Sequence, residues 1–131
     1  MTGTVTLERI GQIGVRVRDL ARATAFYRDV LGLPVVVEAP NLSIVDCGGT
    51  WLLLGGAEAP EFDHPASVLY FDVQDTDAAY EALRAKGVAF RAAPHAVHRE
   101  PSRELRMAFF GDGEGNTFAI RAWRPAAGSA A

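Results

Sequence analysis

The stretch GQIGVRVRDLARATAFYRDVLGLP, residues 11–34, decides the fold of this 131-residue chain. Its first part alternates in polarity, as a half-buried β-strand does. The side chains that we expect to face the core are Ile13, Val15 and Val17. The residues that point the other way are Gln12, Gly14 and Arg16. The expected strand therefore presents a polar Gln12 side chain on the face away from the core.

A helix and three strands are expected after this strand. Asp19 is placed to accept the free N–H groups of a first helical turn. Gly32 suits a left-handed helix end, and Pro34 prevents the helix from continuing. Apolar residues recur at helical spacing between these ends, at Leu20, Ala23, Phe26, Tyr27, Val30 and Leu31. Strands are predicted over 35–38, 42–46 and 50–54, which completes a βαβββ module over residues 9–54.

The same order of elements recurs after a linker, GGAEAPEFDHPA, at residues 55–66. The strand SVLYFDV leads to Asp75, a second expected helix N-cap, and Gly87 ends the second helix. Further strands are predicted near 88–91, 104–110 and 117–123, so the second module covers residues 67–123. One domain over 1–131, built from two copies of one module, explains this repetition. The tail, residues 124–131, is expected to be flexible.

Composition limits the function classes. A net charge of −3 gives no basic surface for nucleic acid, and a single cysteine, Cys47, permits no internal disulfide. The N-terminus does not have the layout of a signal peptide, and no apolar run approaches the ~20 residues of a membrane span. We therefore expect a cytoplasmic protein whose partner is a small molecule, with neither nucleic acid nor membrane as a partner.

The first stretch, together with FFGDGEGNTFAI at residues 109–120, resembles the vicinal oxygen chelate superfamily. That superfamily includes glyoxalase I, extradiol dioxygenases, methylmalonyl-CoA epimerase, and fosfomycin- and bleomycin-resistance proteins. The resemblance extends from about residue 9 to 123. It implies an α+β fold in which two βαβββ modules form an eight-stranded half-barrel cup, and it implies a homodimer.

The resemblance also implies four positions for metal ligands, on the first and last strand of each module. These positions fall on Gln12, Leu53, Val68 and Ala119. A catalytic divalent ion needs about three protein ligands, and three of the four positions are apolar. We therefore expect no metal cofactor. The alternative is a divalent metal on Gln12 with ligands recruited from elsewhere, for which the candidates are Asp72, His95, His98 and Glu104.

Other polar and aromatic residues are candidates for a site in the cup. The segment APHAVHRE, residues 93–100, is either a solvated charged loop or a lip of the cup. In the second case His95 and Glu104 are the candidate catalytic acid and base. Trp51 is expected to stack on a ligand, to fill the cup or to cover a dimer contact. The candidate ligand-binding residues are Gln12, Arg16, Trp51, Leu53, Val68, Tyr70, Asp72, His98, Arg106, Ala119 and Arg121.

Two functions follow from these candidates. The first is a small-molecule-binding protein with a degenerate metal site, of the bleomycin-resistance kind, which holds an aromatic or amphipathic metabolite or drug. The second is a glyoxalase-like lyase, isomerase or dioxygenase that uses Gln12 with recruited ligands. The apolar lining of the expected cup favours the first.

Overall fold

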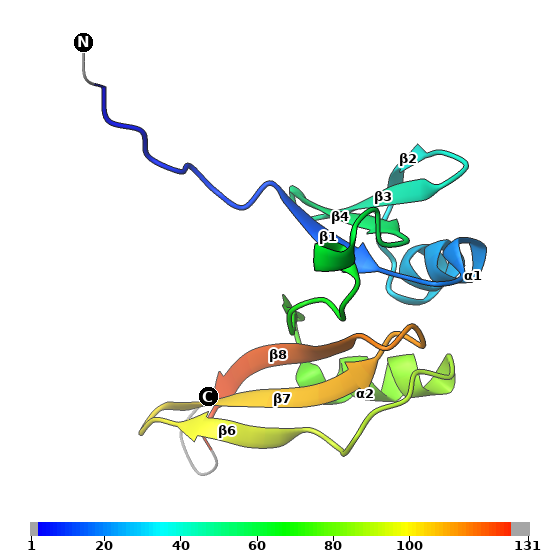
Figure 1. The fold of residues 1–131 in the computed structure, drawn as a ribbon. Helices are drawn as coiled ribbons and strands as arrows, with labels where there is room; N and C mark the ends of the chain where they lie inside the picture. The colour runs from blue at the N-terminus through cyan, green and yellow to red at the C-terminus, as the bar shows by residue number, and fades with distance from the viewer. Residues whose placement is uncertain (1–2, 127–131) are drawn as a thin grey trace.

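The computed structural model describes residues 3–126 and divides them into two four-stranded mixed sheets (Figure 1). Sheet A has the strand order β1-β4-β3-β2, and sheet B has the order β5-β8-β7-β6. The elements of the first module are β1 (Gln12–Arg16), α1 (Leu20–Ala25), β2 (Val35–Glu38), β3 (Leu42–Cys47) and β4 (Thr50–Gly55). A wider helical turn, Phe26–Val30, continues α1.

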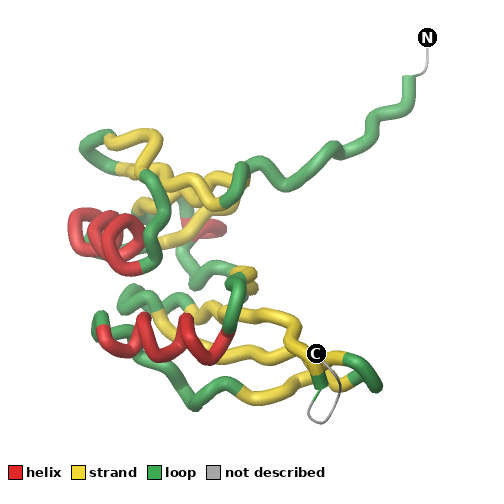
Figure 2. The backbone as a smooth tube through the Cα atoms, turned by 180° about the vertical axis from the view of Figure 1, so that it is seen from behind, coloured by secondary structure: helices red, strands yellow, loops and turns green. Residues whose placement is uncertain are grey.

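The second module repeats this order (Figure 2). Its elements are β5 (Tyr70–Asp72), α2 (Thr76–Ala85), β6 (His95–Arg99), β7 (Arg103–Gly111) and β8 (Thr117–Pro125). In both sheets the first strand of the module pairs in parallel with the last, and the remaining pairs are antiparallel. The predicted α+β fold of two βαβββ modules is confirmed. No helix among residues 3–126 is long and apolar enough to cross a membrane.

The helix ends are those that the sequence predicts. The Asp19 carboxylate accepts a hydrogen bond from the Arg22 N–H at 3.1 Å, and Asp75 accepts one from the Ala78 N–H at 3.1 Å. Gly32 has a φ of +74° and Gly87 a φ of +91°. Only glycine adopts this left-handed conformation without strain, which explains why both helices stop where they do.

One predicted strand is wrong. Residues 88–91 contribute a single bridge, between Phe90 and Phe110, and the edge strand β6 lies instead at His95–Arg99. That segment was expected to be a loop or a lip. The sequence of β6 lacks the apolar alternation of a typical strand. As an edge strand, β6 is held by backbone hydrogen bonds to β7 alone, and polar side chains on an edge strand discourage pairing with another chain.

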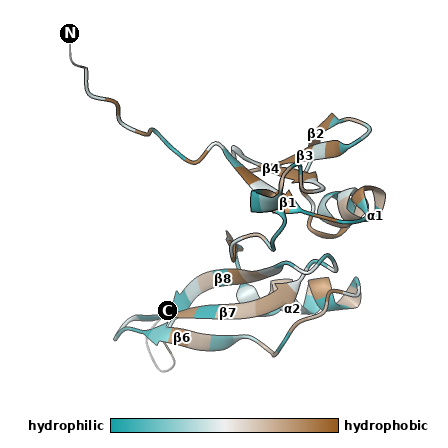
Figure 3. Cartoon of the chain, viewed as in Figure 1, coloured by the Kyte–Doolittle hydropathy of each residue, from teal (hydrophilic) through white to brown (hydrophobic). Residues whose placement is uncertain are grey.

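The tail prediction is corrected in part. Residues 124 and 125 belong to β8, and residues 127–131 lie outside the described part of the chain. At the other end, residues 3–11 form an extended arm, of which residues 9–11 are hydrogen-bonded to residues 49–51 of the first module and the rest leads away from both modules (Figure 1). Hydrophobic residues, coloured brown, occur along this arm as well as on the strands (Figure 3). Those on the arm are exposed, and they are Val5, Leu7 and Ile10.

The two modules share one hydrophobic core. Tyr27, at the end of α1, packs its ring edge against Phe118 of β8, with 6.5 Å between ring centroids. Phe118 in turn contacts Phe71 and Phe110 at 5.6 and 6.1 Å. Phe110 and Phe118 are fully buried on the α2 side of sheet B, and Tyr27 of the first module packs against Phe118, so residues of both modules form one apolar core.

The hairpin between β7 and β8 adds a buried polar connection between the modules. The Asp112 carboxylate accepts hydrogen bonds from the Tyr27 hydroxyl at 2.6 Å and from the Asn116 side chain at 2.8 Å. It also accepts backbone N–H groups from Glu114 and Asn116. Asn116 donates to the Arg16 carbonyl at 3.0 Å. Burial, with the hydrogen bond to Asp112, raises the pKa of Tyr27 far above its ordinary value. The GDGEGN stretch is therefore structural.

We predict that acid weakens this connection through Glu114. Burial raises the pKa of the Glu114 carboxyl, but hydrogen bonds from the Arg18 N–H and the Arg22 guanidinium outweigh burial and hold that pKa below its ordinary value. A carboxyl whose pKa is lower in the folded state stabilises the fold above its unfolded pKa and loses this contribution as the pH falls. The free energy of unfolding should therefore fall with pH below about 4.3.

Urea unfolding measured between pH 6 and pH 3 tests this prediction. A Glu114→Gln variant should be less stable at pH 6 and should lose less stability over the same range, because its side chain does not titrate. Equal pH slopes for the two proteins would show that Glu114 does not contribute to the acid response.

Candidate functional site

The open face of sheet A, the face away from α1, carries the predicted residues of the first module. Register pairs Gln12 with Trp51, Gly14 with Leu53, and Arg16 with Gly55. Their side chains therefore lie in three rows on one face, as the alternation along residues 10–17 predicts. Gln12 is exposed and Trp51 is 40% exposed, whereas Val15 and Leu52 on the opposite face are buried. An exposed tryptophan on this face offers a ring to a ligand or a partner.

A cavity of about 210 Å³ lies against this open face. The linker forms its other wall, because residues 56–64 fold back beside β1 and include a short helical turn, Pro60–Phe62 (Figure 1). The residues that line the cavity are Gly14, Val15, Arg16, Leu53, Gly55, Gly56, Ala57, Glu58, Phe62 and His64. The glycines leave room above the strands, since a Cβ atom at Gly14 or Gly56 would have no atom within 4 Å.

Arg16 is the charged group of this cavity. Its side chain is only 13% exposed, and its Nη1 donates to the Asp63 carboxylate of the linker at 2.9 Å. Within residues 3–126, the Nε of Arg16 is the buried side-chain polar atom that has no hydrogen-bond partner. Arg16 was a candidate from the sequence, whereas residues 55–66 were expected only to link the two modules. The run Phe62-Asp63-His64 could have indicated a role for the linker. It places an aromatic ring next to two ionisable groups in a segment rich in Gly, Ala and Pro.

The open face of sheet B carries the predicted residues of the second module. One row across the sheet joins His95, Met107, Arg121 and Asp72. A neighbouring row joins Phe109, Ala119 and Tyr70. The Tyr70 ring is 50% exposed and meets the Phe109 ring edge-on, with centroids 6.1 Å apart. This face therefore combines aromatic surface with a line of polar groups.

Arg16 and Arg121, both candidate ligand-binding residues, do not lie together. They lie on different sheets, and each has its own carboxylate partner. Arg121 donates to Asp72 at 2.7 Å across neighbouring parallel strands, and both side chains are partly or largely exposed. This pair is therefore a surface ion pair.

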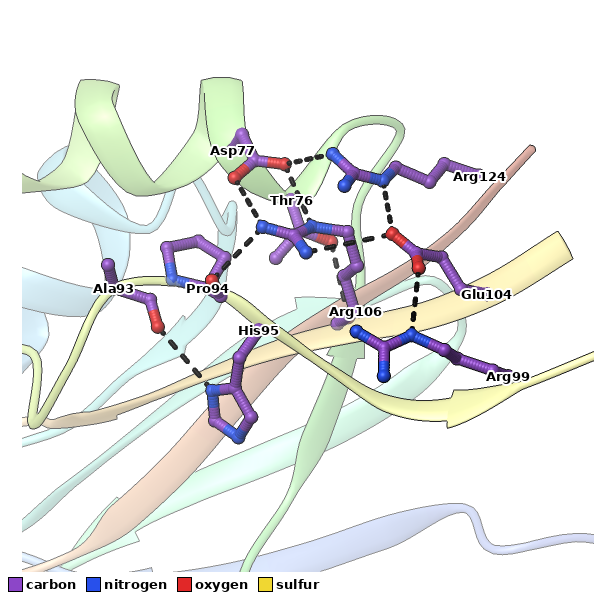
Figure 4. Close-up of polar contacts among 9 residues, drawn as sticks. All are labelled: Thr76, Asp77, Ala93, Pro94, His95, Arg99, Glu104, Arg106 and Arg124. Carbon is purple, nitrogen blue, oxygen red and sulfur yellow. Dashed lines mark hydrogen bonds and ion pairs between the residues drawn. The ribbon is translucent and has the colours of Figure 1, made fainter. Parts of the chain in front are cut away.

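The two candidate catalytic residues, His95 and Glu104, lie on opposite faces of sheet B (Figure 4). Side chains alternate along β7, so Glu104 and Arg106 lie on the α2 side of sheet B, whereas His95 shares the open face with Met107. Arg106 donates to Asp77 of α2 at 3.0 and 3.1 Å. Glu104 and Arg106, both candidates for a site in the cup, therefore face α2 and not the open side of the sheet.

Glu104 belongs to a buried ionic cluster. Its carboxylate accepts from Arg124 at 2.6 Å and from Arg99 at 3.5 Å, and its side chain is only 5% exposed. The hydrogen bond from Arg124 holds the pKa of Glu104 below its ordinary value. A carboxylate that is kept ionised and enclosed by arginines is poorly suited to act as a general acid.

The two histidines on β6 are exposed and weakly held. The Nδ1 of His95 lies 3.5 Å from the Ala93 carbonyl oxygen, at the limit of a hydrogen bond. His98 lies 3.2 Å from Glu100, and its ring meets the Trp123 ring edge-on, with centroids 6.0 Å apart. Both side chains are therefore free to contact a ligand or a partner on this open face.

The residues at the family's metal positions do not fit a divalent ion. Gln12 is exposed on sheet A, Val68 lies just before β5, and Leu53 and Ala119 offer only apolar groups. Among the described residues 3–126, no group of three or more His, Cys, Asp and Glu side chains is placed to hold a metal. One neutral amide cannot supply the charge and the three ligands of a catalytic site.

Comparison with known families gives a clear match. The family model described as the Glyoxalase/Bleomycin resistance protein/Dioxygenase superfamily matches residues 9–120. This range covers both modules and includes the two stretches that carry the resemblance in the sequence.

Individual relatives are more distant. YraH of Bacillus subtilis is 31% identical over 123 residues, which cover 83% of this chain and 94% of that protein. The metallothiol transferase FosB of Staphylococcus haemolyticus is 28% identical over 74 residues, 54% of this chain, and the match spans 53% of FosB. The chain thus matches about half the length of that relative. The structure of TnmS3, an antibiotic-binding protein from a Streptomyces species, has a TM-score of 0.73 at 24% identity and covers 94% of this chain and all of its own.

Proposed function

Because the chain belongs to the glyoxalase/bleomycin resistance protein/dioxygenase superfamily, we propose that it binds a small aromatic or amphipathic molecule without a metal. The observation that carries this proposal is the chemistry of the two open faces. Apolar groups occupy three of the four positions that the resemblance implies for metal ligands, and the Trp51 and Tyr70 rings on these faces are exposed. Exposed apolar surface of this kind marks a site for a ligand or a partner.

The cavity beside β1 and β4 is the proposed binding site. Leu53 and Phe62 supply apolar walls, and Arg16 supplies one charged donor. A mainly apolar lining with a few converging polar groups is the usual composition of a small-molecule site. The fold of TnmS3 supports the class of function, since that protein binds an antibiotic on a scaffold of the same architecture.

The alternative function is a glyoxalase-like enzyme. The local likeness to a metallothiol transferase favours it, although that likeness spans half of each chain. Gln12 would be its one retained metal ligand, and His95 would remain available as an acid or base. The position of Glu104 among three arginines counts against the catalytic pair that the sequence suggested.

Metal retention separates the two functions. We expect protein that is incubated with iron, manganese, nickel, zinc or magnesium and then desalted to retain none of them near stoichiometry, because one amide gives little affinity. Elemental mass spectrometry on untagged protein measures this, with Gln12→Ala as the matched variant. Near-stoichiometric metal that Gln12→Ala abolishes would favour the enzyme.

Ligand binding tests the proposal directly. A ligand present at one hundred times its Kd stabilises the native state by about 2.7 kcal/mol, which a thermal shift detects. We expect hits from a panel of metabolites and drugs to be enriched in aromatic and amphipathic compounds, and equilibrium dialysis should reproduce them. A panel without hits in either assay would contradict the proposal.

We also infer that two chains associate. The support is the arm with its exposed Val5, Leu7 and Ile10, together with the exposed Trp51 on sheet A. Apolar side chains in such positions are normally covered by a partner. Sedimentation equilibrium measures the association, and a monomer at high protein concentration would contradict it.

A further inference from the structure

Arg16 occupies an unusual position for a charged side chain. It lies near the end of β1 with most of its surface buried, although a guanidinium normally keeps its donors in water or in hydrogen bonds. Its Nη1 has a partner and its Nε has none. Buried donors without a partner are rare in folded proteins, and each calls for an explanation. The cavity that Arg16 lines suggests that the missing acceptor belongs to a ligand.

Asp63 is a weak partner for this arginine. Its side chain is 66% exposed, it comes from the linker, and the recorded contact is a single bond from Nη1. An arginine binds a carboxylate best through two parallel N–H donors. Because the Asp63 carboxylate is largely exposed to water, its ion pair with Arg16 contributes little to stability. A carboxylate that enters the cavity can therefore compete with Asp63 for Arg16.

The cavity sets the size and polarity of the competitor. At about 210 Å³ it is smaller than the roughly 300–1,000 Å³ that is usual for a drug-sized ligand. Leu53 and Phe62 offer apolar contact for one or two fused rings, and Gly14 and Gly56 leave space for them. Glu58 also lines the cavity, and within the described residues it forms no ion pair with Arg16. The site is therefore suited to a ring that carries one carboxylate.

We propose that the cavity binds a small aromatic carboxylate. In the free protein Asp63 pairs with Arg16, and the carboxylate of the ligand displaces Asp63 when it binds. This proposal rests on the proposed function and adds the chemical class of the ligand. It also makes Asp63 an internal competitor, so that binding releases Asp63 from Arg16.

Binding of naphthalene-2-carboxylate and of its neutral carboxamide tests the proposal, with each Kd measured by NMR titration. A hydrogen bond to a charged group contributes about 1.5–3 kcal/mol, so the carboxylate should bind about tenfold tighter or more. Arg16→Gln should remove this preference. Arg16→Lys should keep only part of it, because lysine has no paired donors. Asp63→Asn should tighten carboxylate binding about threefold and leave carboxamide binding unchanged.

The control is Asp29→Asn, which removes an equally exposed carboxylate from an arginine pair outside the cavity. It should change neither Kd. Equal binding of carboxylate and carboxamide would overturn this inference and leave the proposed function standing. The same holds if Asp63→Asn weakens carboxylate binding. If neither probe binds to the wild type or to Asp63→Asn, this inference fails, and the broad ligand panel then decides the proposed function separately.

Discussion

A leucine at Gly14 is expected to abolish small-molecule binding in the cavity, with a loss of affinity of about a hundredfold or more. Gly14 lies on β1, faces the cavity and has no atom within 4 Å of where its Cβ would be. A glycine inside a strand often marks the close approach of a ligand. A leucine side chain there would fill the space that the ligand needs. Titration of the best hit from the panel measures the loss.

The fold should tolerate this change. Gly14 has ordinary extended backbone, and glycine is among the least favourable residues in a strand, so the free energy of unfolding should change by about 1 kcal/mol or less. Gly11→Leu is the matched control, since Gly11 also has open space at its Cβ and does not line the cavity. Unchanged ligand affinity in Gly14→Leu would place the binding site elsewhere, and the open face of sheet B would be the next candidate.

Removal of the Asp112 carboxylate is expected to cause a large loss of stability. Asp112 is buried and accepts four hydrogen bonds, among them those from the Tyr27 hydroxyl and the Asn116 side chain. Asp112→Ala leaves these donors buried without an acceptor, at a cost of about 1–3 kcal/mol for each that stays unpaired. We expect the free energy of unfolding to fall by about 3–5 kcal/mol, measured by urea unfolding.

Two further variants serve as comparisons for Asp112→Ala, and both should lose less stability. Asp29→Ala removes an exposed carboxylate and should leave the free energy of unfolding nearly unchanged. Tyr27→Phe removes one of the four donors and should have a smaller effect than Asp112→Ala, of about 1–2 kcal/mol. A loss of less than about 1 kcal/mol in Asp112→Ala would mean that the hairpin does not hold the modules together.

Patterns among neighbouring residues were sufficient to predict most of the fold. Alternation along residues 10–17 predicts the buried and open faces of β1, and Asp19 with Gly32 predicts the limits of the first helix. These features depend on neighbours in the chain, because caps and strand faces arise from contacts within a few residues. The repeat of the same signals around Asp75 was sufficient to predict the second module. The predicted strand at residues 88–91 was wrong. Val88 and Phe90 are apolar because they pack into the core, and their spacing of two residues resembles the alternation of a strand.

The same kind of pattern left β7 ambiguous. Ala108 and Phe110 face the core, but Leu105, Met107 and Phe109 on the other face are also apolar. Alternation alone therefore could not decide on which face Glu104 lies. The covering of one face by α2, and the pairing of Arg106 with Asp77 on that helix, decide it.

The sequence by itself determined the two-module fold and the open-face position of Gln12 and Arg16, because both depend on residue type and strand register. Tertiary structure alone decided which groups meet. It brought Asp63 to Arg16 across 47 residues, joined Tyr27 to Asp112 across 85, and separated Glu104 from His95. These contacts depend on how the linker and the two modules fold against each other, which no local pattern in the chain encodes.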